Sequence, residues 1–277
     1  MMTPRVAAIH DMSGFGRCSL TVAIPILSAM GVQCCPLPTA FLSTHTGGFE
    51  GFTFLDMTDE MSKVADHWAS LGLTFQAVYS GFLGSERQIG VVEDFIRRFG
   101  KDDALAIVDP VMGDHGHAYE TYTPEMCEQM KELVCMADVV LPNVTECCIL
   151  TDTPYREENW TRKELLNMAM MLRLMGAKSV VITGVREGSC YTNVVLEQGQ
   201  YDAKFIRTRS SGGERPGTGD VFSSVVAGAL LNGKSLPEAV SQAAGFVKEC
   251  IKVSDEEQIP HANGVCFEKI LGKLIKK

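Results

Sequence analysis

Short runs of β-branched and other apolar residues alternate along this chain with longer segments of helical periodicity, and this alternation limits its fold more than any other feature. Strand–helix–strand repeats favour a sheet whose strands run mostly parallel, because each helix carries the chain back to the same edge. Such a sheet is covered by helices on both faces. The sequence therefore predicts a three-layer α/β/α fold. It contains no Pro/Gly/Ser-rich linker and no internal repeat, so we expect a single domain over residues 1–277.

The periodicity also places the individual elements. Strands are predicted at Val6–Asp11, Gln33–Leu42, Phe75–Ser80, Ala104–Val108, Asp138–Leu141 and Ser179–Thr183, with an antiparallel pair at Cys190–Leu196 and Tyr201–Arg207. Helices are predicted at Leu20–Met30, Asp59–Leu71, from a capping Ser85 to Phe99, and at Pro124–Met136, Thr161–Met175, Thr218–Leu231, Leu236–Ile251 and Val265–Ile275. In a parallel sheet the ligand site lies beyond the carboxyl ends of the strands, so the loops after the strands are the candidate site.

Charge and composition narrow the classes of partner. The chain has 34 acidic and 25 basic residues and a formal net charge of −9, which disfavours nucleic acid and anionic membranes as main partners. No segment reaches the roughly 18 apolar residues of a membrane span. Met1–Ile9 lacks the pattern of a signal peptide, so we expect a cytoplasmic protein. The ten cysteines form no C-x-x-C pair, and we expect reduced thiols rather than disulfides or zinc ligands.

Small and polar residues follow six of the predicted strands. The side chains and backbone positions that we single out there are Asp11 and Ser13, His45 and Thr46, Phe82, Asp109 and Asp114, Asn143 and Glu146, and Thr183 with Gly184. Any one loop is weak evidence, because loops are polar anyway. Six such loops at one edge of a sheet predict a long cleft. Within it, His45 could act as a base or make a structural hydrogen bond.

The strongest local signal is the turn Arg215–Asp220, which precedes an apolar helix. Gly217 and Gly219 allow the backbone to approach an anion closely, and the start of the helix directs unpaired N–H groups and a positive dipole towards it. An acid beside that anion repels it, but Asp220 could accept the proton of a hydroxyl that attacks phosphorus. The turn alone is equally consistent with Asp220 as a helix cap.

Carboxylates on two neighbouring loops suit a magnesium–nucleotide complex. Mg²⁺ binds between phosphates and one or two carboxylates, often through water, and Asp109, Asp114 and Glu146 offer such groups. Each also has an ordinary explanation, since Asp109 precedes a proline and Glu146 could stabilise a helix start. Other familiar sites are not encoded: the chain has no G-x-x-x-x-G-K-[ST], no G-x-G-x-x-G after a strand, no G-x-S-x-G and no H-E-x-x-H.

The turn Gly217–Asp220 and the helix after it resemble the signature of the ribokinase-like superfamily. Within that superfamily, residues 44–47, 80–84, 109–114 and 142–146 are similar in order and spacing to pyridoxal kinases, and the resemblance extends from Val6 to about Val253. It implies a kinase that transfers the γ-phosphoryl group of ATP to the 5′-hydroxymethyl group of pyridoxal, pyridoxine or pyridoxamine. It also implies a homodimer without a separate lid domain, and a need for K⁺ or Na⁺ besides Mg²⁺.

The resemblance assigns roles residue by residue. Asp220 would be the base, and the backbone of Gly217, Thr218 and Gly219 would hold the transferring phosphate. Asp109, Asp114 and Glu146 would organise Mg-ATP, with Asp109 and Glu146 bound to Mg²⁺ directly or through water. Asn143, Thr183 and Gly184 match nucleotide-side positions. The substrate side would comprise Asp11, Ser13, His45, Thr46 and Phe82, of which Thr46 and Phe82 lie beside the pyridine ring.

Two departures from pyridoxal kinases leave alternatives open. Asp11 stands where these enzymes have Ser, and residues 11–14 look like the opening of hydroxymethylpyrimidine kinases. Phe82 replaces the usual Tyr. Hydroxymethylpyrimidine kinases, however, usually have Cys at the position of Asp220. A hydroxymethylpyrimidine kinase, a catalytically silent binding protein on the same fold and a sugar kinase are therefore the alternatives. The intact Asp220 and the carboxylates favour a pyridoxal kinase.

Overall fold

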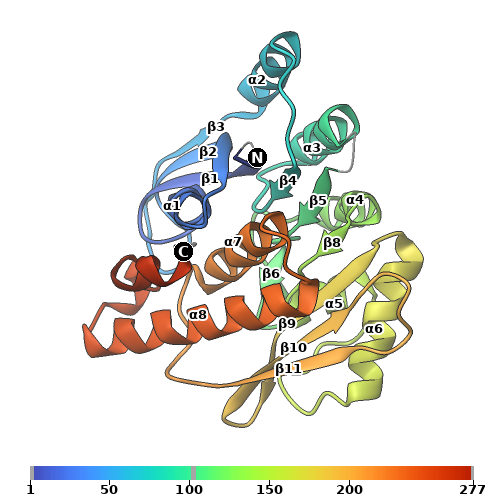
Figure 1. Cartoon of the computed structure of the whole chain (residues 1–277), viewed down its shortest axis with the longest axis vertical. Helices are drawn as coiled ribbons and strands as arrows, with labels where there is room; N and C mark the ends of the chain where they lie inside the picture. Colours follow the sequence, from blue (N-terminus) through green and yellow to red (C-terminus); the bar gives the residue numbers. More distant parts are fainter. Residues whose placement is uncertain (1–2, 101–103, 276–277) are drawn as a thin grey trace.

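The computed structural model describes residues 3–100 and 104–275, and its centre is a nine-stranded sheet covered by helices on both faces (Figure 1). The strand order is β11-β10-β9-β8-β5-β4-β1-β2-β3. The strands are β1 (Arg5–Phe15), β2 (Gln33–Thr44), β3 (Phe54–Asp56), β4 (Ala77–Ser80), β5 (Leu105–Val108), β8 (Val139–Val140), β9 (Ser179–Glu187), β10 (Cys190–Leu196) and β11 (Lys204–Arg209). The six strands from β9 to β2 run parallel, whereas β3, β10 and β11 pair antiparallel. The predicted three-layer, mostly parallel fold is confirmed.

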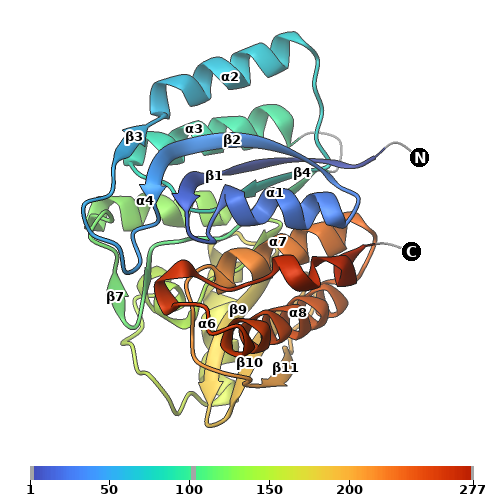
Figure 2. The ribbon, with the colours of Figure 1, turned by 90° about the vertical axis from the view of Figure 1, so that its left-hand side faces the viewer.

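The helices form the two outer layers (Figure 2). One layer contains α1 (Leu20–Ala29), α7 (Thr218–Leu231) and α8 (Leu236–Glu256). The other contains α2 (Thr58–Ser70), α3 (Glu86–Phe99), α4 (Pro124–Cys135), α5 (Val144–Leu150) and α6 (Arg162–Met175). Central strands are buried on both faces, as the run Val6–Ile9 illustrates, because consecutive residues face opposite helix layers.

Several elements differ from the prediction. Strand β1 continues to Phe15, past the loop expected from Met12, and its pairing with β2 shifts register between His10 and Met12. Strand β3, the small hairpin of β6 (Gly113–Asp114) and β7 (His117–Ala118), and helix α5 are additional. The described residues form no separate lid domain, since β3 only extends the sheet edge beside β2.

Two local predictions are wrong. The α-helix expected at Val265–Ile275 is instead a 3₁₀ segment, η2 (Glu268–Leu274), preceded by the short η1 (His261–Asn263). Only Leu274 of η2 is buried and Gly272 lies inside it, so little apolar packing supports a regular helix. Ser85 occupies the N-cap position of α3, but its side chain makes no capping hydrogen bond.

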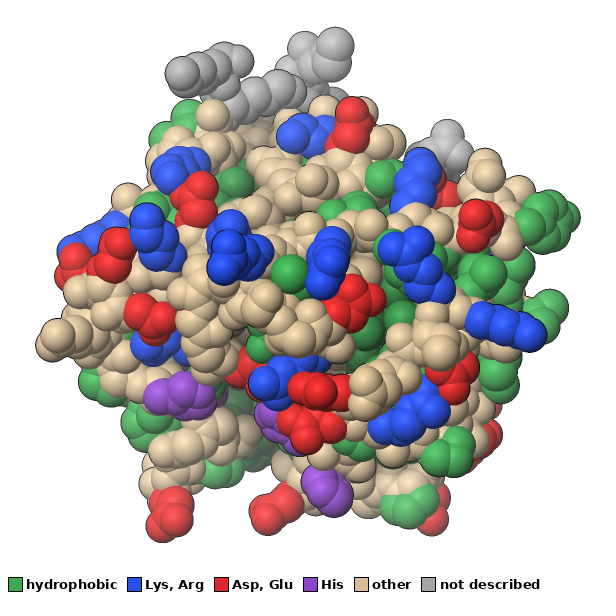
Figure 3. All heavy atoms as spheres, turned by 90° about the horizontal axis from the view of Figure 1, so that it is seen from below, with side chains coloured by type: hydrophobic (Ala, Val, Ile, Leu, Met, Phe, Trp, Pro, Cys, Tyr) green, Lys and Arg blue, Asp and Glu red, His purple; other side chains and the backbone are tan. Residues whose placement is uncertain are grey.

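All ten cysteines have free thiols. Over residues 3–100 and 104–275, no helix is both long and apolar enough to cross a membrane. The face in Figure 3 carries Lys and Arg side chains interspersed with Asp and Glu. A polyanion that approached this face would therefore meet charges of both signs.

Candidate active site

The glycine-rich turn lies at the start of α7, against the loop that follows β1. Gly217 is the N-cap residue with φ 80°, and a Cβ atom built on it would lie 1.8 Å from the carbonyl oxygen of Arg17. Both the backbone angle and the close approach require glycine here. The first-turn N–H groups of a helix have no partner within the helix. In α7 the Thr218 N–H makes a long bond of 3.4 Å to the Arg215 carbonyl, and a helix start of this kind can receive an anion.

Asp220 is the third residue of α7. No side chain caps this helix, so capping does not account for the carboxylate. Burial, followed by the negative charges of Asp109 and Asp11, raises the pKa of Asp220 to about 7, although the backbone N–H of Ser19 opposes the shift. A carboxylate beside an anion-binding turn with a pKa near neutrality is suited to accept a proton.

Asp109 lies at the carboxyl end of β5 and is hydrogen-bonded to α7, the helix that carries Asp220. Its Oδ2 accepts a hydrogen bond from the Ser223 hydroxyl at 2.6 Å. Burial raises the pKa of Asp109 to about 6, and the Ser223 bond lowers it. Ser223 was not among the predicted residues. Its spacing of three from Asp220, which places both on one helix face, is the signal that could have identified it.

Glu146 and Asn143 form a reciprocal capping box at the start of α5. The two carboxylate oxygens of Glu146 accept from the backbone N–H groups of Met112 (3.1 Å) and Asn143 (2.8 Å). The Asn143 side chain donates to the carbonyl of Gly113 (2.9 Å). Burial and the nearby Asp109 raise the pKa of Glu146 well above its usual range. This box joins the loop after β5 to the loop after β8.

The nucleotide-side positions on β9 lie next to that box. Asn143 forms a parallel bridge with Thr183, whose N–H donates to the carbonyl of Pro142 at 2.8 Å. Gly184 has φ 67°, and its N–H donates to the side chain of Asn193 at 3.2 Å. The structure thus brings together the predicted residues Asn143, Glu146, Thr183 and Gly184.

Asp114 lies on the β6–β7 hairpin with its side chain half exposed. The neighbouring His115 lies 3.8 Å from the Asp114 carboxylate and 3.4 Å from that of Glu214. The hairpin is also fixed to α5, because the Gly116 N–H donates to the Thr145 hydroxyl at 2.9 Å. It therefore spans from α5 to the segment just before the glycine-rich turn.

The donor set fits a divalent cation together with phosphate groups. The described segments contain no group of three or more His, Cys, Asp or Glu side chains that could hold a metal by itself. Asp109 and Glu146 are buried oxygen donors, and the charge of Asp109 raises the pKa of Glu146. A cation would relieve that repulsion, and Mg²⁺ typically uses one or two carboxylates plus phosphate oxygens and water. Such an ion would supply charge neutralisation to the phosphates.

On the acceptor side, Asp11 and Ser13 are buried in the last part of β1, and Asp11 is bonded to the loop that follows this strand. The Asp11 carboxylate accepts hydrogen bonds from the hydroxyls of Ser13 (3.0 Å) and Ser19. Burial raises the pKa of Asp11. Ser19 was not predicted, and its positive φ of 54° marks a strained backbone that sequence patterns do not reveal. These contacts fix the shape of the first loop.

His45 has both ring nitrogens occupied. Nδ1 accepts from the Gly47 N–H at 3.1 Å, which leaves Nε2 to donate to the Ala262 carbonyl at 2.7 Å. This arrangement favours the structural interpretation of His45 over a free base. Thr46 beside it is exposed. Phe82 is half-buried and packs edge-on against Tyr122, with ring centroids 6.5 Å apart.

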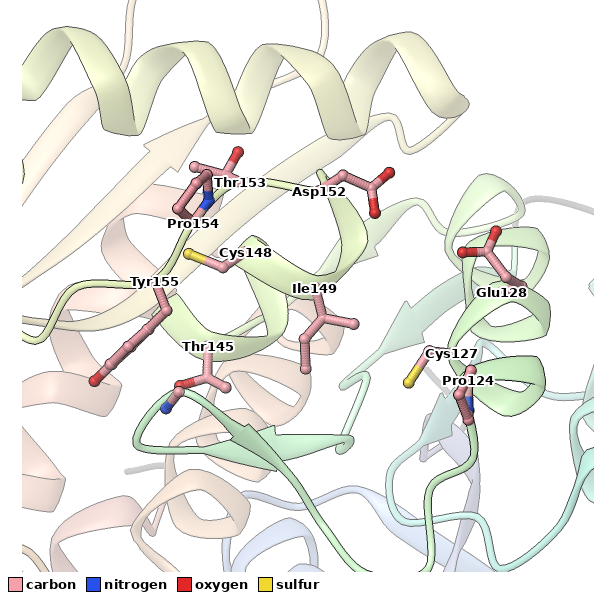
Figure 4. A pocket seen from close by; sticks show the side chains of 11 residues that line it. Pro124, Cys127, Glu128, Thr145, Cys148, Ile149, Asp152, Thr153, Pro154 and Tyr155 are labelled. Carbon is pink, nitrogen blue, oxygen red and sulfur yellow. The ribbon is translucent and has the colours of Figure 1, made fainter.

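A cavity of about 550 Å³ lies between α5, the start of α4 and the segment after α5 (Figure 4). Thr145, Cys148 and Ile149 of α5 line it, and Cys127 lies across from them on α4. None of the predicted site residues is among its lining residues. The predicted cleft is therefore a different feature from this cavity.

We expect the ligand-free protein to melt at a higher temperature at about pH 5.5 than at about pH 8. Asp220 and Asp109 have pKa values raised to about 7 and about 6 in the folded protein. The folded state then binds these protons more tightly than the unfolded chain, so stability is gained as pH falls through this range and lost as it rises. Thermal unfolding followed by circular dichroism measures the difference, which Asp220→Asn should reduce. A melting temperature that does not increase at the lower pH contradicts the prediction.

Comparison with known proteins identifies the family. The model of the family described as phosphomethylpyrimidine kinase matches residues 24–266. The chain belongs to this family. A protein from Bacteroides thetaiotaomicron described as a phosphomethylpyrimidine kinase, crystallised with pyridoxal, is 42% identical with a TM-score of 0.93, and the match covers 99% of this chain and 96% of that one.

Two further relatives represent the two acceptor classes. Pyridoxal kinase from Lactobacillus plantarum is 27% identical with a TM-score of 0.90, covering 99% of this chain and 97% of that one. The hydroxymethylpyrimidine/phosphomethylpyrimidine kinase of Rhizobium meliloti is 26% identical over 267 residues, covering 95% of this chain and 96% of the relative. The predicted relationship to vitamin kinases is confirmed. The chain is a phosphotransferase with an alcohol group as acceptor, and as a member of this kinase family it uses ATP with a divalent metal ion.

Proposed function

We propose that the protein phosphorylates the 5′-hydroxymethyl group of pyridoxal, pyridoxine and pyridoxamine with ATP as donor. The observation that carries this assignment is the pyridoxal in the crystal structure of the 42% identical Bacteroides thetaiotaomicron protein, whose fold matches this chain over 99% of its length. A carboxylate, Asp220, stands beside the glycine-rich turn, and its raised pKa suits proton transfer from an alcohol.

In the proposed reaction, Asp220 accepts the proton of the acceptor hydroxyl as the oxygen attacks the γ-phosphorus of ATP. The new O–P bond forms while the bond between the γ-phosphorus and the β–γ bridging oxygen breaks, and ADP leaves. Backbone N–H groups of Gly217, Thr218 and Gly219 hold the transferring phosphoryl group, where negative charge develops. Asp220 is partly buried, and an acceptor bound against it would cover its remaining surface from water, which favours transfer to the alcohol over hydrolysis.

The remaining roles are part of the same proposal. Asp109 and Glu146 would hold Mg²⁺, directly or through water, with Asp114 beside the phosphates. Asn143, Thr183 and Gly184 would face the nucleotide. Asp11, Ser13, Thr46 and Phe82 would contact the acceptor, and His45 would belong to the substrate side by holding the loop that carries Thr46.

The domain organisation, the oligomeric state, the monovalent-ion requirement and the location of the enzyme are also proposed. A single domain is supported by the one continuous nine-stranded sheet. We further propose a homodimer that requires K⁺ or Na⁺, on the resemblance to pyridoxal kinases. A cytoplasmic location is supported by the ten free thiols, which suit a reducing compartment.

Hydroxymethylpyrimidine is the second candidate acceptor. Asp11 favours hydroxymethylpyrimidine, because residues 11–14 resemble the first loop of hydroxymethylpyrimidine kinases. The Rhizobium meliloti relative is also named as a kinase of this acceptor. Asp220 in place of Cys favours the B6 vitamers.

A substrate panel separates the candidates. We expect initial rates of ADP release with Mg-ATP to be highest for one of the three B6 vitamers, lower for hydroxymethylpyrimidine and at background for ribose. The preference is measured as kcat/KM for each acceptor. Turnover of hydroxymethylpyrimidine alone would replace the proposed acceptor, and turnover of none of the panel would reject the vitamin-kinase assignment.

A further inference from the structure

A C-terminal strap, residues 259–268, connects three loops of the candidate active site. Backbone carbonyls of the strap accept from three different loops: Ile259 from Arg215 (2.9 Å), Ala262 from His45 (2.7 Å) and Asn263 from Arg17 (3.1 Å). In the other direction, the Val265 N–H donates to the Pro216 carbonyl at 3.2 Å. The loop after β1, the loop after β2 and the glycine-rich turn are thus bound to one short segment.

The strap fits closely against these loops. A Cβ atom on Gly264, which has φ 77°, would lie 3.1 Å from the backbone nitrogen of Arg17, and one on Gly16 would lie 2.2 Å from the His45 ring. Val265 and Phe267 are buried in the core between the sheet and the layer of α1, α7 and α8. The strap is therefore anchored in the core and can hold the loops that lie against it, at the end of the sheet where β1 and β2 finish (Figure 2).

The loop after β2 depends on this anchor. Thr46, Gly47 and Gly48 are exposed. Two bonds between Ser43 and Thr53 close the far end of this loop, at 3.2 and 2.9 Å. Near Thr46 its backbone is held by the turn bonds at Gly47 and Gly48 and by the long bond from the His45 N–H to the Phe15 carbonyl, at 3.4 Å. The His45 ring bridges this loop to the strap, because Nδ1 holds Gly47 and Nε2 holds Ala262. Its edge-on contact with Phe49, at 5.0 Å between ring centroids, packs the far side of the same loop.

We propose that the C-terminal strap is a positioning element of the acceptor site, and that His45 and Arg17 are the positioning residues through which it acts. His45 sets the position of Thr46, and Arg17 sets the first loop against Gly217. This inference deepens the proposed function and rests on it for the identity of the acceptor. It assigns no direct contact between His45 and the substrate.

The two His45 bonds can be tested separately with a matched pair of variants. The amide of Gln can place its nitrogen where Nε2 lies and donate to Ala262, whereas the shorter Asn can only replace Nδ1 as acceptor for Gly47. We expect His45→Gln to keep the acceptor KM within about 3-fold of the wild type. His45→Asn should raise the acceptor KM by about 3- to 10-fold, the range expected for loss of the one hydrogen bond to the strap. His45→Ala, which loses both bonds, should raise it by at least as much. The KM for ATP should change by less than about 2-fold in all three.

Other outcomes would overturn the proposal. If His45 contacts the substrate or acts as a base, Gln will be as damaging as Ala and kcat will fall with it. If His45 only stabilises the fold, both KM values will move together or not at all, while the melting temperature falls. The KM values of the variants are measured with whichever acceptor the wild-type protein phosphorylates. A wrong B6 assignment would therefore show in the wild-type protein, whereas a wrong role for the strap would show in the variants.

Arg17→Met provides an independent variant if the His45 series folds poorly. It removes the bond to Asn263 and the ion pair with Glu268, in which Arg17 Nε lies 2.7 Å from Glu268 Oε1. We expect a rise of about 3- to 10-fold in acceptor KM. Combined with His45→Asn, it should give less than the product of the two single effects, because both residues act through one segment. Fully multiplicative effects would reject a shared strap.

Discussion

Replacing Asp220 by Asn is expected to lower kcat by about 10²- to 10⁴-fold, the usual contribution of a general base. The amide has nearly the same shape, so the fold and the glycine-rich turn should persist. Removal of a partly buried carboxylate whose pKa is raised to about 7 should also increase the melting temperature at alkaline pH. Loss of activity together with a gain of stability would distinguish a catalytic carboxylate from a structural one.

The control for this variant is Asp152→Asn. Asp152 is an exposed carboxylate that lies 3.3 Å from Lys131, and it lines the cavity beside α5 and is not one of the proposed site residues. Asp152→Asn should leave kcat and the KM values for ATP and for the acceptor unchanged. Titration calorimetry with Mg-ATP should show similar affinity for the wild type and for Asp220→Asn. A near-wild-type kcat in Asp220→Asn would exclude it as the base.

Gly217→Ala is expected to have the second largest effect, a decrease in kcat of about 10²- to 10³-fold, as for loss of a donor in an oxyanion-type site. A left-handed backbone costs a non-glycine residue about 1–2 kcal/mol, and the new methyl group would overlap the Arg17 carbonyl. The turn must then shift, which misdirects its N–H groups. Steady-state kinetics and denaturant unfolding measure the two effects.

Gly219→Ala is the matched variant for folding. Gly219 has no left-handed backbone, and a Cβ atom built there meets no atom within 4 Å. Its unfolding free energy should therefore stay close to that of the wild type, whereas that of Gly217→Ala should fall. Equal stability of the two alanine variants would contradict the account of the turn.

The sequence predicts well those parts of the molecule that depend on local pattern. The apolar runs and helix periods place the parallel strands β1, β2, β4, β5, β8 and β9 and the long helices, because each buries its own stripe of residues. Loops at the carboxyl ends of parallel strands share one edge by topology, so Asp109, Asn143, Glu146 and Thr183 could be grouped before any coordinates. The sequence also contains the capping-box pattern of Asn143 and Glu146, yet the seven-residue helix that begins there was not predicted.

Long-range contacts account for most of what was not predicted. The C-terminal strap lies more than 200 residues from Arg17 and His45, and three of its bonds use backbone carbonyls, which carry no residue-specific signal. The strained Ser19 and the bond from Ser223 to Asp109 depend on how α1 and α7 meet the sheet. The predicted C-terminal α-helix was wrong because Val265 and Phe267 are buried before η2 begins, which leaves Leu274 as the one buried residue within η2.

The most direct test of the proposed function is identification of the product. Wild-type protein incubated with Mg-ATP and an equimolar mixture of pyridoxal and hydroxymethylpyrimidine should form mainly pyridoxal 5′-phosphate, detected by mass spectrometry and phosphorus NMR. Asp220→Asn should form almost none in the same time. Phosphorylated hydroxymethylpyrimidine as the only product, or undiminished pyridoxal 5′-phosphate from Asp220→Asn, would contradict the account.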